Sequence, residues 1–366
     1  MTDARPAALL TVDLDALVSN WRAMAARARP AACAGVVKGD GYGLGAGPVS
    51  RALYRAGCRH FFVARLSEGI ELRDFVGEDA SVCVLDGLGA GEAETFRRRD
   101  LTPSLNDPGQ IAMWAAAARA AGERLKANLH FDTGMSRLGL TPGEAEALLT
   151  DPAPLTALDL RYVMSHLVSS EEPDNPINAA QLALFHRFRA EFPGVKASFA
   201  NSSGVFLGAD YHYDLVRPGC AVYGINPTPG RDNPVRTVAT LEVRILQVRE
   251  IDHPQTVGYG ATWQATRPTK VATIACGYAD GWLRSLSGRG AAFIGDRQVP
   301  FLGRVSMDLI TLDVTDAPGA VPGTMVELLG PRMTVDEVAD RAGTNGYEVL
   351  TRLGRRFARA YREPAA

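Results

Sequence analysis

The chain has few cysteines, and their arrangement suggests no pairing. Five occur among 366 residues. They are dispersed, odd in number and without Cys-x-x-Cys or Cys/His spacing, which argues against a disulfide framework and against a zinc site. We therefore expect no metal centre, and we expect most of these residues to be small buried side chains. They are Cys33, Cys58, Cys83, Cys220 and Cys276.

An excess of charge of either sign is also absent. The formal net charge is −2 at pH 7 with the histidines neutral. Proteins that bind nucleic acid or anionic membrane surfaces usually carry a strong basic patch or a high net positive charge. The sequence therefore predicts a small-molecule partner, with no nucleic acid and no membrane.

Long apolar runs are missing as well. No stretch approaches the roughly 18 uninterrupted apolar residues of a membrane-spanning helix. The first ten residues, MTDARPAALL, lack the basic region and apolar core of a secretory leader. We therefore expect the protein in the cytoplasm.

What is present is a regular alternation of short β-rich runs and amphipathic helical stretches. It begins with a helical pattern from Asp13 to Ala28 and continues to about residue 220. About eight strands alternating with helices are typical of a (β/α)8 barrel of the triosephosphate isomerase type, although an open doubly wound sheet fits the same alternation. The expected strands are 33–37, 61–64, 82–85, 101–106, 125–131, 158–164, 197–199 and 213–216, and a second helix is expected over 111–121.

The pattern changes after residue 231. Segments 237–251, 270–278, 291–303 and 307–314 read as strands separated by turns, with little helix between them. Thr334 and Glu337 form a capping-box pattern ahead of one late helix. The segment GINPTPGRDNP, from Gly224 to Pro234, is a natural linker. We therefore predict an α/β barrel domain over 1–231 and a mostly β domain over 232–366.

The stretch AGVVKGDGYGLGAG places Lys38 directly after an apolar run and before closely spaced glycines. On its own this pattern fits a solvated lysine at a strand end. It also fits a strand that delivers its last side chain to a site, because glycine lets the following backbone approach a ligand closely. A lysine there can form a Schiff base if burial or nearby cations keep its amine neutral.

Polar residues follow other predicted strands, at the face where such barrels carry their sites. Arg217 follows the eighth strand in VRPGCAVYG, and Asn201 follows the seventh in ANSSG. Arg137 lies near Asp132 in the turn HFDTGMSRLG, where an arginine fork suits a carboxylate. His166 follows the sixth strand in MSHL. Each has an ordinary structural explanation, but together they point to one site.

These motifs together resemble alanine racemase, a pyridoxal-phosphate enzyme of fold type III. The resemblance runs from VDLDAL to GYEVL and keeps one order of motifs: VVKGDGYG, DTGMSRLG, SHL, ANSSG, RPGCAVYG, VGYGATW, GYADG and GRVSMD.

The resemblance implies two catalytic bases. Lys38 corresponds to the lysine that holds pyridoxal 5'-phosphate and exchanges the α-proton on one face, and Tyr259 in VGYGATW to the tyrosine on the opposite face. Racemisation needs both, because a proton removed from one side must be returned from the other. Tyr259 lies in the second domain, so the resemblance implies a homodimer with shared active sites.

The resemblance also implies contacts to cofactor and substrate. Arg217 corresponds to the arginine at the pyridine nitrogen, where a guanidinium with a pKa above about 12 keeps its proton. His166 corresponds to a neighbour of that arginine. Arg137 and the backbone of Met307 correspond to substrate contacts. The residues that correspond to phosphate contacts are Tyr42, Ser202, Gly219 and Cys220, with Asn201 alongside.

Three positions depart from the family pattern. His130 stands where many members carry a carbamylated lysine, and histidine cannot form that carbamate, so another group must orient Arg137. Leu44 replaces a common histidine. Arg355 lies roughly where many members place a tyrosine on the phosphate, so that contact is left unassigned.

The resemblance thus predicts an alanine racemase that supplies D-alanine for bacterial peptidoglycan. A racemase of broader specificity, for serine or basic amino acids, is an alternative within the family. A non-catalytic pyridoxal-phosphate carrier, or a barrel without cofactor, belongs to another class. Carriers are usually a lone barrel, so the second domain with Tyr259 argues against that alternative.

Overall fold

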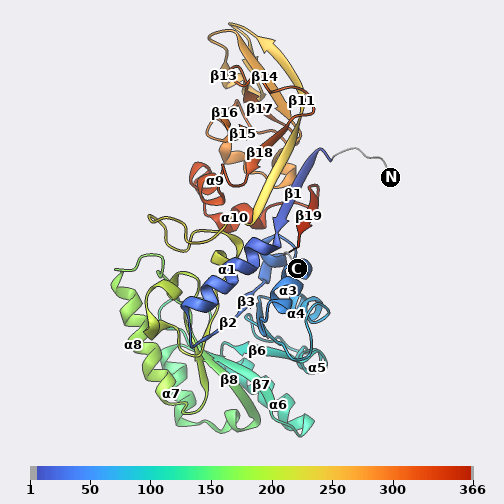
Figure 1. Cartoon of the computed structure of the whole chain (residues 1–366). Coiled ribbons are helices and arrows are strands. Elements are labelled where there is room, and N and C mark those ends of the chain that lie inside the picture. Colours follow the sequence, from blue (N-terminus) through green and yellow to red (C-terminus); the bar gives the residue numbers. More distant parts are fainter. Residues whose placement is uncertain (1–5, 364–366) are drawn as a thin grey trace.

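The computed structural model describes residues 6–363, which form a parallel barrel and a separate, mostly antiparallel sheet (Figure 1). The barrel strands are β2 Ala32–Cys33, β3 Gly35–Val36, β4 His60–Val63, β5 Ser81–Val84, β6 Leu101–Leu105, β7 Leu125–His130, β8 Leu158–Met164, β9 Lys196–Ser198 and β10 Leu215–Val216. Helices alternate with them: α1 Leu14–Arg27, α2 Lys38–Tyr42, α3 Ala46–Arg55, α4 Leu66–Arg73, α5 Ala93–Arg98, α6 Pro108–Ala121, α7 Pro142–Thr150 and α8 Pro176–Ala190.

The strand order closes the ring. It runs β2-β10-β9-β8-β7-β6-β5-β4-β3. β2 pairs with β10 and β3 pairs with β4, and only Ala34 separates β2 from β3, so the two act as the halves of one first strand. The predicted α/β barrel is confirmed, and the open doubly wound sheet is not the arrangement present.

Local sequence explains where several barrel helices begin. Asp107 accepts a hydrogen bond from the backbone N–H of Gln110 and is followed by proline, as Asn175 is at α8. An oxygen-bearing cap followed by proline satisfies a free N–H and presets the backbone for the first turn. The strands between the helices are apolar because both faces are covered; all five residues of β6 are buried.

The second sheet has eight strands in the order β14-β17-β16-β15-β18-β11-β1-β19. They are β1 Ala8–Asp13, β11 Ala239–Ile251, β14 Thr269–Ile274, β15 Ala291–Ile294, β16 Arg297–Leu302, β17 Ile310–Asp313, β18 Met325–Leu329 and β19 Ala358–Arg362. A short hairpin lies between β11 and β14 in the sequence and consists of β12 Thr256–Val257 and β13 Trp263–Gln264. Helices α9 Val335–Ala342 and α10 Gly346–Thr351 follow, and α9 begins at the predicted Thr334–Glu337 capping box.

The first strand connects the two parts of the chain. β1 pairs antiparallel with β11 and parallel with β19, so the predicted segment 1–231 contributes one strand to the second sheet. The sequence pattern predicts no strand there, because the first helical pattern begins at Asp13, which caps α1. The domain division at residues 231 and 232 itself stays a prediction.

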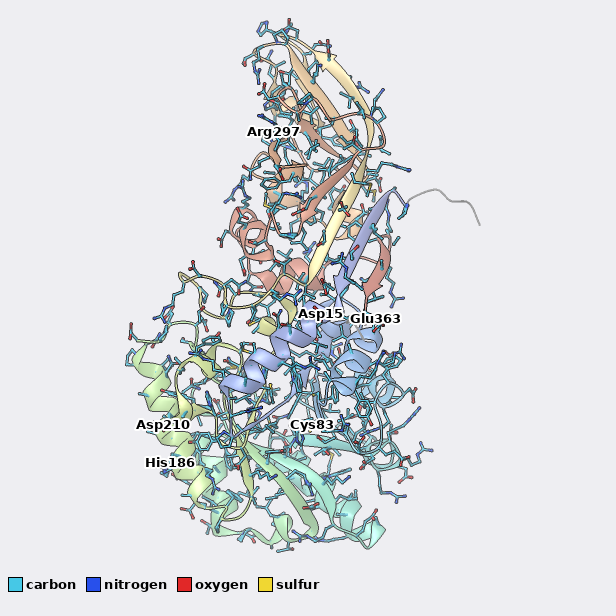
Figure 2. The ribbon with its side chains drawn as sticks, in the orientation of Figure 1. Asp15, Cys83, His186, Asp210, Arg297 and Glu363 are labelled. Carbon is cyan, nitrogen blue, oxygen red and sulfur yellow. The ribbon has the colours of Figure 1, made fainter. Side chains whose placement is uncertain are left out.

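Buried apolar side chains form one large cluster that extends from the barrel into the second sheet. All five cysteines are free and buried, among them Cys83, which is labelled in Figure 2. Across residues 6–363, no helix has the length and apolar character needed to cross a bilayer.

Candidate active site

A cavity of about 790 Å³ opens at the carboxyl ends of the barrel strands. Its wall includes residues at or just after the ends of most of these strands, together with Tyr347 and Thr351 of α10. Every barrel residue predicted for the site lines it: Lys38, Tyr42, Arg137, His166, Asn201, Ser202, Arg217, Gly219 and Cys220. The structure therefore brings together residues that are far apart in the sequence.

Lys38 begins α2, whose backbone explains the glycine-rich sequence. Residues 39 to 42 all have positive φ, including Gly39 at 64° and Gly41 at 60°. Asp40 adopts this conformation too, and its Oδ1 accepts a hydrogen bond from the backbone N–H of Ala46 at 2.8 Å. Left-handed backbone is costly for most residues but not for glycine. The tight turn thus holds Lys38 at the cavity wall.

The environment of Lys38 favours the neutral amine. Burial is the main cause of a lowered Lys38 pKa, and the guanidinium groups of Arg137 and Arg217 lower it further. The carboxylates of Glu68 and Asp86 act in the opposite direction. A neutral amine is the nucleophilic form of lysine, so the site favours the chemistry predicted for this residue.

Hydrogen-bond donors gather at one end of the cavity. The backbone N–H groups of Gly219 and Ala221 both donate to Ser202 Oγ, at 2.9 and 3.2 Å. The Tyr42 ring stacks on Tyr223 with 4.4 Å between centroids. A Cβ at position 219 would collide with the Tyr42 hydroxyl, so glycine is required there. Because its oxygen accepts these two bonds, the Ser202 hydroxyl keeps its hydrogen to donate, and a hydroxyl donor held in this way suits a phosphate.

Arg217 is buried without a carboxylate partner among residues 6–363. One guanidinium nitrogen donates to Ser165 O at 2.6 Å, and the other donates to Ser198 Oγ. Burial lowers the Arg217 pKa to about 10, below the value above 12 expected from the sequence. Arg217 nevertheless remains protonated at neutral pH, so it presents an uncompensated cation to the cavity.

His166 lies beside Arg217 and is neutral. Its Nδ1 is 3.4 Å from an Arg217 nitrogen, and because arginine can only donate, this Nδ1 is the acceptor. Burial lowers the His166 pKa well below its ordinary value, and the charge of Arg217 adds to the effect. The predicted neighbour relation between the two residues is therefore present in the fold.

His130 pairs with a residue that the sequence analysis did not single out. Its Nδ1 is 2.7 Å from Asn106 Oδ1, while Asn106 Nδ2 donates to Leu85 O at 3.0 Å. The second bond fixes the amide orientation, so His130 carries its proton on Nδ1. Burial lowers the His130 pKa to about 4, and Arg217 and Arg137 contribute. Neutral His130 therefore retains Nε2 as a hydrogen-bond acceptor, and the residue lines the cavity.

Tyr347 was missed by the sequence analysis, although it lies within the GYEVL motif that ends the resemblance. Its ring centroid is 6.0 Å from that of Tyr42, and its hydroxyl contacts Cys220. Arg355, the position left unassigned, is exposed and does not line the cavity. Tyr347 thus provides a tyrosine at the donor-rich end.

Tyr259 and Met307 lie outside this cavity within a single chain. They belong to loops of the second domain, with 73% and 55% of their surfaces exposed. These loops are close together, because Gly258 lies against Arg304 and Gly277 against the backbone of Met307. Tyr278 on the same set of loops is also exposed. Exposed aromatic and apolar side chains grouped in this way are typical of an interface.

Comparison with known proteins identifies the family of the whole chain. The protein-family model for the alanine racemase N-terminal domain matches residues 12–227, and the family model for the C-terminal domain matches residues 238–361. An alanine racemase from Rhodospirillum rubrum is 53% identical over 98% of this chain and 96% of its own length. One from Methylobacterium nodulans is 50% identical over 97% and 96%.

Solved structures show the same likeness. The alanine racemase of Bartonella henselae, described with covalently bound pyridoxal phosphate, superposes with a TM-score of 0.95 at 38% identity, covering 98% of this chain and all of that one. The enzyme of Streptomyces lavendulae gives 0.93 at 31% identity, covering 98% of each chain. The chain therefore belongs to the alanine racemase family.

Proposed function

We propose that this protein interconverts L-alanine and D-alanine with pyridoxal 5'-phosphate and that it supplies D-alanine for peptidoglycan. The observation that carries the proposal is that Lys38, Arg217 and the donor cluster around Ser202 line the same cavity. The proposal includes a cytoplasmic homodimer with shared active sites.

The residues present fit this cofactor. Its aldehyde requires an amine, which Lys38 offers in a neutral-favouring environment. Its phosphate requires donors, and the Ser202 hydroxyl offers one, because its oxygen accepts from Gly219 and Ala221 and its hydrogen stays free to donate; Tyr42, Asn201 and Cys220 line the same cavity. The Arg217 guanidinium can donate hydrogen bonds but cannot accept one, so it suits a ring nitrogen that accepts a hydrogen bond.

When bound, pyridoxal phosphate withdraws electrons from the α-carbon of the amino acid and makes its proton acidic. Arg217 limits this effect, because it is protonated at neutral pH and offers the ring nitrogen a hydrogen bond without transferring a proton. His166 accepts a hydrogen bond from Arg217 and helps to hold its guanidinium in place.

Two bases move the α-proton. Lys38 Nζ accepts or returns it on one face, and Tyr259 of the partner subunit does so on the other with its phenolic oxygen. This division explains why Tyr259 is largely exposed in a single chain. Arg137 binds the substrate carboxylate, and the backbone N–H of the partner's Met307 assists from across the interface.

His130 provides the replacement for the missing carbamate. With Asn106 holding its Nδ1–H, Nε2 is free to accept a hydrogen bond from the Arg137 guanidinium. A neutral acceptor orients arginine without neutralising it, so Arg137 keeps its full charge for the carboxylate.

Deuterium exchange at the α-carbon tests the proposal. The purified protein in D₂O is expected to racemise both alanine enantiomers and to exchange their α-hydrogens. Lys38→Ala and Tyr259→Phe should each suppress exchange from one enantiomer preferentially. Bound cofactor with no exchange from either enantiomer would indicate a carrier. Racemisation of serine, lysine or arginine at a rate similar to that of alanine would indicate a broader racemase.

The biosynthetic role needs a separate test, since a relative from Mesorhizobium japonicum at 49% identity is named a catabolic alanine racemase. Expression in a bacterium that requires D-alanine should remove that requirement. Growth on D-alanine as sole carbon source, without relief of the requirement, would instead favour the catabolic role.

A further inference from the structure

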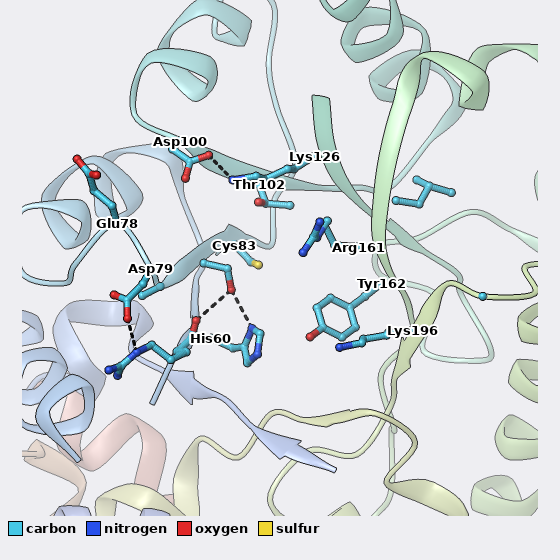
Figure 3. Close-up of a pocket in the computed structure, with 15 residues that line it drawn as sticks. His60, Glu78, Asp79, Cys83, Asp100, Thr102, Lys126, Arg161, Tyr162 and Lys196 are labelled. Atoms are coloured by element: carbon cyan, nitrogen blue, oxygen red, sulfur yellow. Dashed lines mark hydrogen bonds and ion pairs between the residues drawn. The ribbon is translucent and has the colours of Figure 1, made fainter. Parts of the chain in front are cut away.

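Carboxylates at the two ends of the barrel have different partners. At the end where the strands begin, around a cavity of about 390 Å³, acids pair with cations, as Asp100 does with Lys126 at 2.8 Å (Figure 3). At the active-site end, Glu68 binds backbone N–H groups and forms no ion pair within the part of the chain that the structure describes. The contacts of Glu68 therefore hold the backbone and leave its charge unpaired.

Three backbone N–H groups donate to the Glu68 carboxylate. Those of Ala64 and Arg65 donate to Oε2 at 2.8 and 3.1 Å, where α4 begins. The third belongs to Gly39, 29 residues earlier in the chain, and donates to Oε1 at 2.6 Å. Hydrogen bonds to a charged acceptor are about twice as strong as those between neutral groups. One carboxylate thus joins the start of α4 to the residue that follows Lys38.

The turn after Lys38 depends on contacts from elsewhere in the fold. Residues 39–42 have left-handed backbone, and two of them, Asp40 at a φ of 55° and Tyr42 at 54°, are not glycine. Such residues are strained in this conformation and keep it only where the surrounding structure holds them. A contact that anchors the turn therefore also fixes the position of Lys38.

Glu68 supplies the anchor at the lysine end of this turn. Before Lys38, the N–H of Val37 donates to Phe62 O at 2.9 Å, which continues the pairing of β3 with β4. After Lys38, the N–H of Gly39 donates to Glu68. The backbone of Lys38 is thus held by a hydrogen bond on each side.

The far end of the turn is held by β19. Arg359 donates to Gly43 O at 2.7 Å, and the Tyr361 hydroxyl donates to Leu44 O at 3.1 Å. Neither of these two side chains lines the cofactor cavity, whereas Glu68 does. Glu68 is therefore the one of the three that can act on Lys38 through space as well as through the backbone.

The charge of Glu68 also acts on Lys38. Burial is the main cause of the lowered Lys38 pKa and Arg137 lowers it further, while Glu68 opposes both effects. A nearby carboxylate favours the protonated form of an amine. Removal of the carboxylate therefore has two separate consequences, a turn that is held less firmly and a Lys38 pKa that falls.

We propose that Glu68 is a positioning residue for Lys38, whose carboxylate holds the N–H of Gly39 and so fixes the turn from which Lys38 reaches the cofactor and the substrate. Glu68 touches no reacting atom and acts through Lys38. The role rests on the proposed function, in which Lys38 moves the α-proton on one face of the substrate. The defect caused by losing Glu68 should therefore fall on that face.

Initial rates of α-hydrogen exchange in the cofactor-loaded protein test this role. Glu68→Ala removes both acceptor oxygens and should slow exchange about tenfold from the enantiomer that Lys38→Ala suppresses, because a hydrogen bond to a charged group is lost. Exchange from the other enantiomer should slow less. Glu68→Gln keeps the side-chain size and one acceptor oxygen, so it should show the same bias to a smaller extent. The glutamine variant serves as the test if the alanine variant does not fold.

Glu92→Ala is the matched control. Glu92 lies directly before α5, and its Oε2 accepts a hydrogen bond from the backbone N–H of Gly89 at 2.6 Å, the same distance as that between Glu68 and Gly39. Glu92 does not line the cofactor cavity. Its loss should leave exchange from both enantiomers unchanged.

Two readouts on the cofactor-free protein do not depend on activity. Hydrogen–deuterium exchange followed by mass spectrometry should show a Gly39 amide that exchanges several-fold faster in Glu68→Ala than in the parent. The pH midpoint for acylation of Lys38 should move to lower pH in both Glu68 variants, whereas a site that had only loosened would admit water and move it to higher pH. Both variants retain the other charges that act on Lys38, which are those of Arg137, Arg217 and Asp86.

Slower exchange from one enantiomer, together with faster exchange of the Gly39 amide, supports the proposal. Equal slowing of both enantiomers, or an unchanged Gly39 amide, would overturn it. A parent protein that exchanges neither enantiomer would instead refute the proposed function, and the Gly39 amide would still report whether Glu68 holds the turn.

Discussion

At the scale of single residues, burial decides the protonation states around the cavity. Lys38, His130, His166 and Arg217 all have pKa values below their ordinary ones, and removal from water is the main cause for each. Desolvation disfavours the charged form of a base. The two histidines are therefore neutral at pH 7, while Arg217 still carries its charge because its ordinary pKa is so high.

Arg137 provides a test of this electrostatic account. Its positive charge disfavours the protonated form of Lys38, so Arg137→Ala should raise the Lys38 pKa. The measurement is the pH dependence of acylation of Lys38 by an amine-selective reagent in cofactor-free protein. The midpoint should move to higher pH, and Arg65→Ala, at another lining arginine, should move it less. A midpoint that moves to lower pH in Arg137→Ala would contradict the account.

Asn106 provides a second residue-scale prediction. Without its amide, the His130 ring loses the contact that fixes Nδ1–H and directs Nε2. We expect Asn106→Ala to raise the KM for alanine about fivefold with a smaller change in kcat, as expected for losing one hydrogen bond worth about 1 kcal/mol. Steady-state kinetics in both directions measure this split.

Ser104→Ala is the matched control for that experiment. Ser104 lies on the same strand, β6, and its buried hydroxyl has no hydrogen-bond partner among residues 6–363. Its loss should leave KM unchanged. Equal effects of the two substitutions would show that Asn106 contributes only to packing.

At the scale of elements, helix α10 connects the second domain to the cavity. Asn345 caps it by accepting a hydrogen bond from the backbone N–H of Glu348 at 3.0 Å. The helix brings Tyr347 and Thr351 to the cavity wall. α9 has a comparable cap at Thr334 but contributes no lining residue.

This difference predicts two distinct outcomes. Asn345→Ala and Thr334→Ala should each lower the free energy of unfolding by about 1 kcal/mol, the usual cost of a lost cap. Only Asn345→Ala should also raise the dissociation constant for pyridoxal phosphate, by several-fold, because it loosens the helix that carries Tyr347. Thermal unfolding and cofactor titration measure the two effects. A similar cofactor affinity in both variants would argue against a role for α10 in binding.

The elements also show which helix and strand bounds can be predicted from sequence patterns alone. Strand β8 begins and ends at the predicted residues, Leu158 and Met164, and α9 starts at its predicted capping box. These features depend on local composition and on neighbouring side chains. β1 and β19 were not predicted, although each is longer than β4 or β5. They join the sheet by pairing with segments that are far away in the chain, as when Leu10 meets Leu241 and Arg359.

At the scale of the whole molecule, the proposed function requires two chains. Lys38 lines the barrel cavity, while Tyr259 is exposed on the other domain of the same chain. A C2 dimer would place each Tyr259 at the other subunit's cavity and form two equivalent sites.

Subunit mixing tests this arrangement. Lys38→Ala and Tyr259→Phe homodimers should each be nearly inactive. After unfolding and refolding together in equal amounts, half of the dimers are expected to be mixed, each with one intact site, so activity should return to about a quarter of the parent value. No recovery, with mixed dimers demonstrated by mass spectrometry, would show that both bases belong to one subunit.

The sequence by itself determined the barrel, the mostly β second part and the motifs that end on one face. Periodicity, caps and glycine-rich turns act over a few residues, so they can be read directly. Only the tertiary structure decided that Asn106 holds His130 and that Tyr347 reaches the donor-rich end. These relations join residues from separate strands and helices, and their geometry follows from how the strands close and the helices pack, which no local pattern encodes.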